Sequence, residues 1–242
     1  MKDELFRLWV YLSTTPLLGL TATLVAYQVG TALYRRSGAN PLVNPVLIAV
    51  VALAVLLAAT QTPYRTYFEG AQFVHFLLGP ATVALAVPLY RHFETIRRSA
   101  LAIAVSIVAG SVTAIVVAVG TAWLMGASSR TLLSLAPKSV TTPVAMGISE
   151  EIGGLPPLTA VLVILTGIVG AVFATWTLNA AGIRDWRARG LGVGVAAHGI
   201  GTARAFQVNE LAGAFSSLAM GLNALATAIG LGERRVGEES RS

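Results

Sequence analysis

Apolar segments of about 20 residues recur from end to end of this 242-residue chain. A helix of that length crosses a hydrocarbon core of roughly 30 Å. Charged residues make up only 12% of the sequence and the mean hydropathy is +0.72, whereas soluble domains carry roughly 25% charged residues. Such a chain cannot cover its own surface with polar groups. The sequence therefore predicts an all-α, polytopic membrane protein.

The apolar segments predict about seven transmembrane helices, over residues 8–33, 42–60, 71–90, 99–124, 156–180, 190–204 and 206–231. A further, interrupted segment lies at 131–149. No domain-sized hydrophilic stretch separates these segments, so residues 1–231 are expected to form one transmembrane domain, followed by a polar tail over 232–242. The first segment has no clear small-residue cleavage site, which favours a retained helix over a signal peptide.

Basic residues in the connections predict the orientation. One side is expected to hold eleven of the seventeen basic residues: Arg35, Arg36, Arg91, Arg97, Arg98, Arg184, Arg187, Arg189, Arg234, Arg235 and Arg241. The positive-inside rule places this side in the cytoplasm, together with the C-terminus, and places the N-terminus outside. The count requires segment 131–149 to enter and leave on the same side. A re-entrant or broken hairpin is therefore predicted there.

Several classes of function are disfavoured by the composition. The chain has no cysteine, and its three histidines lack metal-ligand spacing. It has no GxxxxGK[ST] phosphate loop, no GxSxG elbow and no HExxH motif. The net charge of +6 comes from residues in short connections rather than on one face, so nucleic acid is not an expected partner. We expect no enzymatic activity, no metal and no cofactor.

Three interruptions in the apolar segments combine proline or glycine with hydroxyl or charged side chains. Such residues leave backbone groups without helical partners, which lipid cannot satisfy, so the clusters are expected to face protein or water. The first contains Pro80 and Thr82, where a helix start with free amides favours an anion. The second, over 137–143, and the third, over 198–204, supply further candidates for substrate binding: Lys138, Ser139, Thr141, Thr142, Gly201 and Thr202.

Broken helices in corresponding parts of a chain are typical of midplane substrate sites in secondary transporters. Lys138 could pair with a substrate carboxylate, or it could snorkel from a re-entrant loop to the interface. The hydroxyl groups could donate to an anion or bond back to helix carbonyls. A short echo between residues 80–84 and 137–141 leaves an internal repeat open.

Three titratable residues are candidates for coupling transport to H⁺ or Na⁺: Glu150, Glu151 and His198. A desolvated carboxylate holds its proton near neutral pH, which would suit proton coupling. The two glutamates precede Gly153 and Gly154, however, and are interpreted first as a solvated loop on the external side. His198 could relay a proton, or it could only hydrogen-bond a broken helix.

Three strings, LLGPATVALAVPLYRH, PKSVTTPVAMGISEEIGG and AAHGIGTARAFQ, resemble signature segments of the LrgB/CidB family. The similarity extends over nearly all of the chain. Bacterial members are paired with a smaller LrgA/CidA-type membrane protein and were described as antiholin-like or holin-like factors in murein hydrolase control. Plant relatives are plastid glycolate/glycerate translocators, and some bacterial pairs are linked to pyruvate uptake. Because the first segments already fit the LrgB pattern, the resemblance implies a separate LrgA/CidA-type partner.

Two functions follow as hypotheses. The leading one is a secondary carrier, in the cell inner (plasma) membrane, for small monocarboxylates such as glycolate, glycerate or pyruvate. The rival is an antiholin-like or holin-like regulator of murein hydrolase activity and lysis that acts through oligomers. A carrier would turn its polar clusters inward, whereas a regulator could place them between subunits. The sequence alone leaves this choice open.

Overall fold

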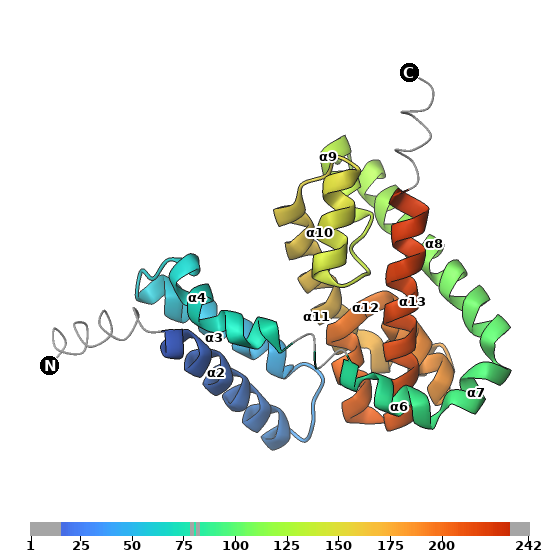
Figure 1. The fold of residues 1–242 in the computed structure, drawn as a ribbon, viewed down its shortest axis with the longest axis horizontal. Coiled ribbons are helices and arrows are strands. Elements are labelled where there is room, and N and C mark those ends of the chain that lie inside the picture. The colour runs from blue at the N-terminus through green and yellow to red at the C-terminus, as the bar shows by residue number, and fades with distance from the viewer. Residues whose placement is uncertain (1–15, 78–79, 81–82, 233–242) are drawn as a thin grey trace, which may run out of the picture. The chain divides into compact units, whose positions relative to one another are not determined.

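The computed structural model describes residues 16–77, 80 and 83–232, and every regular element among them is an α-helix (Figure 1). The predicted all-α class is therefore confirmed for the described residues. Contacts group the chain into two compact units, Met1–Ala84 and Leu85–Ser242, which are described separately. The single membrane domain over 1–231 stays a prediction.

The first unit contains α2 (Pro16–Arg36), α3 (Pro45–Ala59) and α4 (Tyr64–Phe76). Asn44 caps α3, because its side chain accepts hydrogen bonds from the amides of Val46 and Leu47, and Pro45 occupies the first turn. Helix α2 packs closely on both neighbours: a Cβ at Gly30 would lie 2.6 Å from the Pro45 carbonyl oxygen. Asn44 and Pro45 therefore form the start of this helix.

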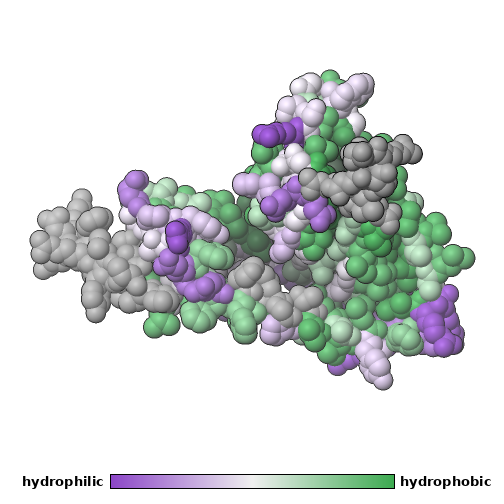
Figure 2. Space-filling view, turned by 45° about the horizontal axis from the view of Figure 1, so that its top comes forward, coloured by the Kyte–Doolittle hydropathy of each residue, from purple (hydrophilic) through white to green (hydrophobic). Residues whose placement is uncertain are grey.

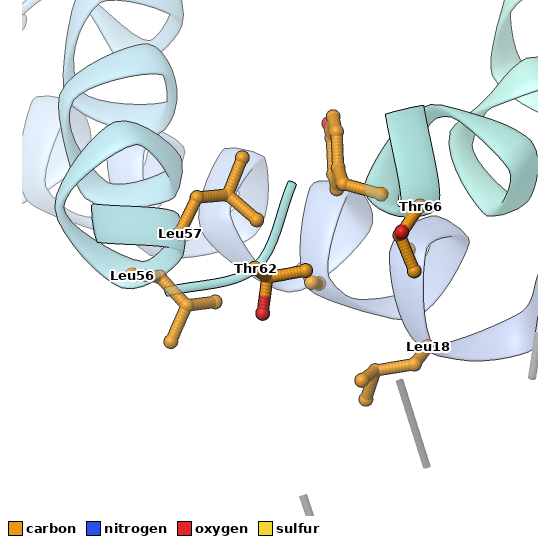
Figure 3. Close-up of a pocket in the computed structure, with 8 residues that line it drawn as sticks. Leu18, Leu56, Leu57, Thr62 and Thr66 are labelled. Carbon is orange, nitrogen blue, oxygen red and sulfur yellow. The ribbon is translucent and has the colours of Figure 1, made fainter. Parts of the chain in front are cut away.

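A small pocket lies among the three helices of the first unit (Figure 3). Its volume is about 20 Å³, roughly the space of one water molecule. Its lining includes Leu18, Leu56, Leu57, Thr62 and Thr66. The pocket is a packing gap and is too small for a two- or three-carbon acid.

The second unit contains α6 (Ala86–Arg91), α7 (Phe93–Arg98), α8 (Ala100–Leu124), α9 (Ser129–Leu135), α10 (Thr142–Glu151), α11 (Pro156–Ala180), α12 (Trp186–Val208) and α13 (Glu210–Gly232). Figure 1 shows α9 and α10 at one end of this unit and α6 and α7 at the other. An ion pair of 3.2 Å between Arg91 and Glu210 joins the end of α6 to the start of α13.

Four described helices are long and apolar enough to cross a membrane: Leu17–Arg36, Ala100–Leu124, Pro156–Ala180 and Glu210–Leu231. Helix α3 is apolar but shorter. The segment predicted as a span at 71–90 is not one described helix, because α4 ends at Phe76 and α6 begins at Ala86. The count of seven spans therefore stays a prediction.

Apolar side chains face outward along the long helices of the second unit, and Figure 2 shows hydrophobic residues over much of its visible face. A contiguous apolar surface of this kind is unfavourable in water and favourable in lipid. Exposed examples on α8, α11 and α13 are Leu101, Val105, Val161, Val169, Leu225 and Ile229. The surface fits the predicted membrane protein.

The first half of α12 runs parallel to α13. A Cβ at Gly190 would meet the carbonyl of Ala212, and a Cβ at Gly194 would meet the carbonyl of Ser216. Residue numbers therefore rise together along both helices. Glycine at both positions lets the two backbones approach more closely than any side chain would allow.

The second half of α12 runs the opposite way. The Thr202 and Ser216 hydroxyl oxygens lie 2.8 Å apart, and Ala205 packs with Ala212. Residue numbers fall along the second half of α12 as they rise along α13, so the chain reverses direction near His198. The two ends of α12 line one pocket, which includes Trp186, Arg189, Arg204 and Val208. Helix α12 is thus a hairpin, not the straight crossing predicted at 190–204.

Helices α9 and α10 form a second hairpin. The Ser134 hydroxyl of α9 accepts a 2.8 Å hydrogen bond from the amide of Leu155, which follows α10. The chain therefore leaves α9, turns at residues 137–141 and returns to the same place. This hairpin starts at the Pro156 end of α11, whereas the α12 hairpin starts at the Ala180 end, where Arg189 donates to Asn179. The two hairpins enter the unit from opposite ends.

Candidate functional site

The tip of the α12 hairpin is His198, whose backbone has φ 40° and ψ −133°. This left-handed region is strained for any residue with a side chain, and such strain persists where packing imposes it. The ring is 4% exposed and its Nε2 lies 2.9 Å from the Val163 carbonyl oxygen. A Cβ at Gly167 would lie 2.7 Å from the ring, so glycine there makes room for the imidazole. The tip is fixed against the middle of α11.

The tip of the α9–α10 hairpin carries the predicted lysine. Lys138 is half-buried, and its Nζ donates a 3.1 Å hydrogen bond to the Ser139 hydroxyl. Ser139 is buried, while Thr141 and Thr142 are half-buried at the start of α10. Lys138 lies close enough to His198 to act electrostatically on the ring. The second and third sequence clusters therefore meet.

Asn223 of α13 joins the two hairpins. Its side-chain Nδ2 donates to the Ser139 carbonyl at 3.2 Å and to the Val195 carbonyl, three residues before His198, at 3.4 Å. The side chain is 0% exposed. The sequence analysis missed this residue. An amide in the middle of an apolar membrane segment was the signal, since polar groups there are costly unless they are used.

The other residues of the third cluster serve packing at the same level. Thr202 is buried, and its hydroxyl lies 2.8 Å from both the His198 carbonyl oxygen and the Ser216 hydroxyl. Gly201 is buried, and a Cβ there would lie 2.5 Å from the Ala197 side chain. Gly201 lets the two halves of the hairpin approach each other, and Thr202 ties the second half to α13.

An open groove of about 570 Å³ leads to Lys138 from the surface of α8. It lies between α8, the end of α9 and the tip of the hairpin. Its lining includes Thr113, Val117, Thr121, Met125, Leu135 and Lys138. Lys138 is the charged group in this lining, so an anion in the groove would meet a cation.

A hydroxyl network ties the base of the α9–α10 hairpin to α11. The Thr159 hydroxyl lies 2.7 Å from the Ser149 hydroxyl and 2.9 Å from the Ser134 carbonyl oxygen. All three side chains are 0% exposed. Polar groups buried in this way stabilise a unique arrangement when each has a partner. The network fixes where the hairpin begins.

The base of the α12 hairpin is polar and basic. Asp185 caps α12 by accepting from the Arg187 amide, and its carboxylate also pairs with the Arg187 guanidinium. This hydrogen bonding lowers the pKa of Asp185 to about 2. Arg189 stacks over Trp186 at 4.9 Å from the ring centroid. The Asp185–Arg187 pair therefore remains charged across the physiological pH range.

The remaining sequence candidates lie apart from the two tips. Glu150 and Glu151 are exposed, but they form the last turn of α10 and not the loop that the sequence indicated. Pro80 is exposed, and Thr82 lies outside the described residues. The structure thus brings together Lys138, Ser139 and His198, and it adds Asn223 to them.

Comparison with known proteins gives consistent matches over most of the chain. The model of the LrgB-like family matches residues 23–232. "Uncharacterized protein YwbG" of Bacillus subtilis (strain 168) is 36% identical over 211 residues, which cover 87% of this chain and 93% of that protein. "Holin-like protein CidB" of Staphylococcus epidermidis (strain ATCC 12228 / FDA PCI 1200) is 33% identical, with coverage of 86% and 90%. 

"Antiholin-like protein LrgB" of Bacillus mycoides (strain KBAB4) is 31% identical, with coverage of 89% of this chain and 94% of that protein. No solved structure matches the chain. The resemblance read from the three signature strings is confirmed by matches that run through both hairpins and the helices between them. The chain belongs to the LrgB-like family.

Proposed function

We propose that this chain acts in the cell inner membrane as a holin-like or antiholin-like protein, the description carried by its relatives from Staphylococcus epidermidis and Bacillus mycoides. The observation that carries the proposal is their identity of 33% and 31% over nine-tenths or more of those proteins. Such a protein would regulate murein hydrolase activity and lysis, through oligomers or together with an LrgA/CidA-type membrane protein.

A lysis assay tests this proposal. The chain is expressed in a host that lacks its own LrgB-type protein, with and without an LrgA/CidA-type partner, and the decay of culture turbidity is followed. A regulator is expected to change the lysis rate. The Lys138→Ala variant is expected to change it by the same amount, because oligomer formation does not need that charge. If the lysis rate is unchanged both with and without the partner, the regulator proposal is contradicted.

The second candidate is a secondary carrier for small monocarboxylates such as glycolate, glycerate or pyruvate. The observation that favours it is the meeting of two hairpin tips at mid-length of α11 and α13, beside a lysine that a groove reaches. Tips at this depth leave backbone groups and a positive charge where a membrane carrier binds its substrate. Coupling to H⁺ or Na⁺ belongs to the same proposal, with His198 as the buried titratable residue at the tip of the α12 hairpin.

For both candidates we propose that α8, α11 and α13 cross the membrane, while α9–α10 and α12 are re-entrant hairpins. The end that carries Arg91, Arg97, Arg98, Arg184, Arg187 and Arg189 is then cytoplasmic by the positive-inside rule. Because α12 returns to its starting end and α13 crosses once, the end of α13 lies on the outside. The sequence prediction, by contrast, placed the C-terminus in the cytoplasm.

Uptake by proteoliposomes tests the carrier. The purified chain, with its LrgA/CidA-type partner, is expected to accumulate labelled glycolate or pyruvate when a pH or Na⁺ gradient is imposed. Liposomes without protein and liposomes with collapsed gradients are the controls. If labelled monocarboxylates neither accumulate nor exchange, the carrier proposal is wrong, and the lysis assay then tests the remaining regulator proposal.

A further inference from the structure

Asn223 holds one polar atom that the fold does not use. Its Nδ2 donates to two carbonyl oxygens, but its Oδ1 is buried and has no hydrogen-bond partner among the described residues. Native proteins pair most buried polar atoms, so an unpaired one calls for an explanation. Since Nδ2 already meets both carbonyls, turning the amide over would place Oδ1 against two other acceptors. The observed orientation leaves Oδ1 available for a donor.

The position of this atom is tied to that of Lys138 through Ser139. The Lys138 ammonium contacts the Ser139 hydroxyl at 3.1 Å, and the Asn223 amide contacts the Ser139 carbonyl at 3.2 Å. A single residue therefore separates a cation, reached by the groove, from a buried acceptor. A small ligand with an anionic group at one end and a hydrogen-bond donor beside it carries partners for both groups.

We propose that Asn223 determines specificity for 2-hydroxy monocarboxylates: Lys138 and the Ser139 hydroxyl hold the carboxylate, and Asn223 Oδ1 accepts the hydrogen bond of the 2-hydroxyl group. The inference rests on the carrier proposal. It adds a residue and a choice among substrates to that proposal.

The chemistry of the acceptor makes the choice. An amide oxygen accepts but does not donate. A 2-hydroxyl group can donate a hydrogen bond to this oxygen. A 2-oxo group is itself only an acceptor and cannot donate to it, and an unsubstituted acid leaves the oxygen without a partner. A site built around a substrate hydroxyl discriminates against analogues without one, because its own polar group then stays buried without a partner.

Access to Asn223 requires the hairpin tips to separate. The side chain is 0% exposed, whereas Lys138 is half-buried at the groove. The carboxylate therefore meets Lys138 first, and the hydroxyl reaches Asn223 after the 137–141 tip moves. Because the amide of Asn223 holds this tip to α12, binding and opening use the same residue.

Competition among three acids with the same carbon count tests the inference. Proteoliposomes with the full chain and its partner take up labelled glycolate, and 2-hydroxypropanoate, 2-oxopropanoate and propanoate are compared as inhibitors. We expect 2-hydroxypropanoate to inhibit at concentrations about tenfold lower than the other two, the size of one good hydrogen bond. In Asn223→Leu that ratio is expected to fall to about one.

The ratio separates specificity from a general loss of structure, because a misfolded site lowers the affinity for all three acids alike. Thr227→Val, one turn further along α13, also removes a buried polar group, whose oxygen lies 3.3 Å from that of Ser111. It should keep the ratio. Equal inhibition by the three acids in the unmodified chain, even if Asn223→Leu does not fold, overturns the inference and leaves the carrier standing. Absence of any uptake overturns the carrier itself.

Discussion

Gly194→Ala is expected to destabilise the protein strongly, because the added Cβ would meet the Ser216 carbonyl and would lie 2.8 Å from the Ala219 side chain. The first contact is with backbone, which cannot rotate away as a long side chain can. Overpacking of this kind costs typically about 1–3 kcal/mol. In a protein of this size each kcal/mol lowers the unfolding temperature by about 2–4 °C.

The measurement is the unfolding temperature of the purified protein in detergent, followed by tryptophan fluorescence. Gly221→Ala on α13 is the matched control, since a Cβ there meets nothing within 4 Å. It should be neutral or stabilising, because alanine is the better helix former. If Gly194→Ala unfolds at the same temperature as Gly221→Ala, the parallel packing of the first half of α12 against α13 is wrong.

Lys138→Ala is expected to abolish or strongly weaken monocarboxylate uptake if the carrier proposal holds. Removing one partner of a desolvated charge pair typically costs about 2–5 kcal/mol, or roughly 30-fold to several-thousand-fold in affinity. Lys138→Arg should also transport poorly, because a planar fork replaces a compact ammonium. Ser139→Ala should cost less, since a neutral hydrogen bond contributes about 0.5–1.5 kcal/mol net.

Apparent affinity in proteoliposomes is the readout, with protein level and oligomeric state measured in parallel. Arg130→Ala is the control for a lost positive charge, because Arg130 is exposed on α9 of the same hairpin. It should transport normally. If the Lys138→Ala protein is well produced and its apparent affinity is unchanged, the lysine is an interfacial anchor. An anion would then be bound by hydroxyl groups and backbone amides alone.

Local chemistry made parts of the fold predictable. Asn44 before Pro45 is a sequence pattern typical of a helix start, because a short polar side chain and a fixed φ act only on the next turn. The clusters at 137–143 and 198–204 predicted helix breaks for the same local reason. The site at the breaks was therefore visible as separate pieces, and Lys138 and His198 were both identified in the sequence.

The path of the chain between these breaks depends on distant contacts. Residues 190–204 were predicted as a crossing, but α12 is not among the four described helices that are apolar enough for one. The registers of Gly194 and Thr202 against Ser216 show that the helix reverses. A stretch of 15 residues is short for a hydrocarbon core that needs about 20, which was the available signal. The role of Asn223 could not be predicted, because the two carbonyl groups to which it donates lie 28 and 84 residues away in the sequence.

The two hairpins enter from opposite ends and meet at their tips, and cysteine labelling tests this arrangement directly. Since the chain has no cysteine, single cysteines can be introduced and labelled in intact cells with a membrane-impermeant maleimide. Four exposed positions flank the hairpins: Ala181, Gln207, Ser129 and Glu151. Cysteines at Ala181 and Gln207 should both be protected until the membrane is permeabilised, and those at Ser129 and Glu151 should both label from outside. Labelling of Ala181 and Gln207 from opposite sides would show that α12 crosses the membrane and would contradict the account.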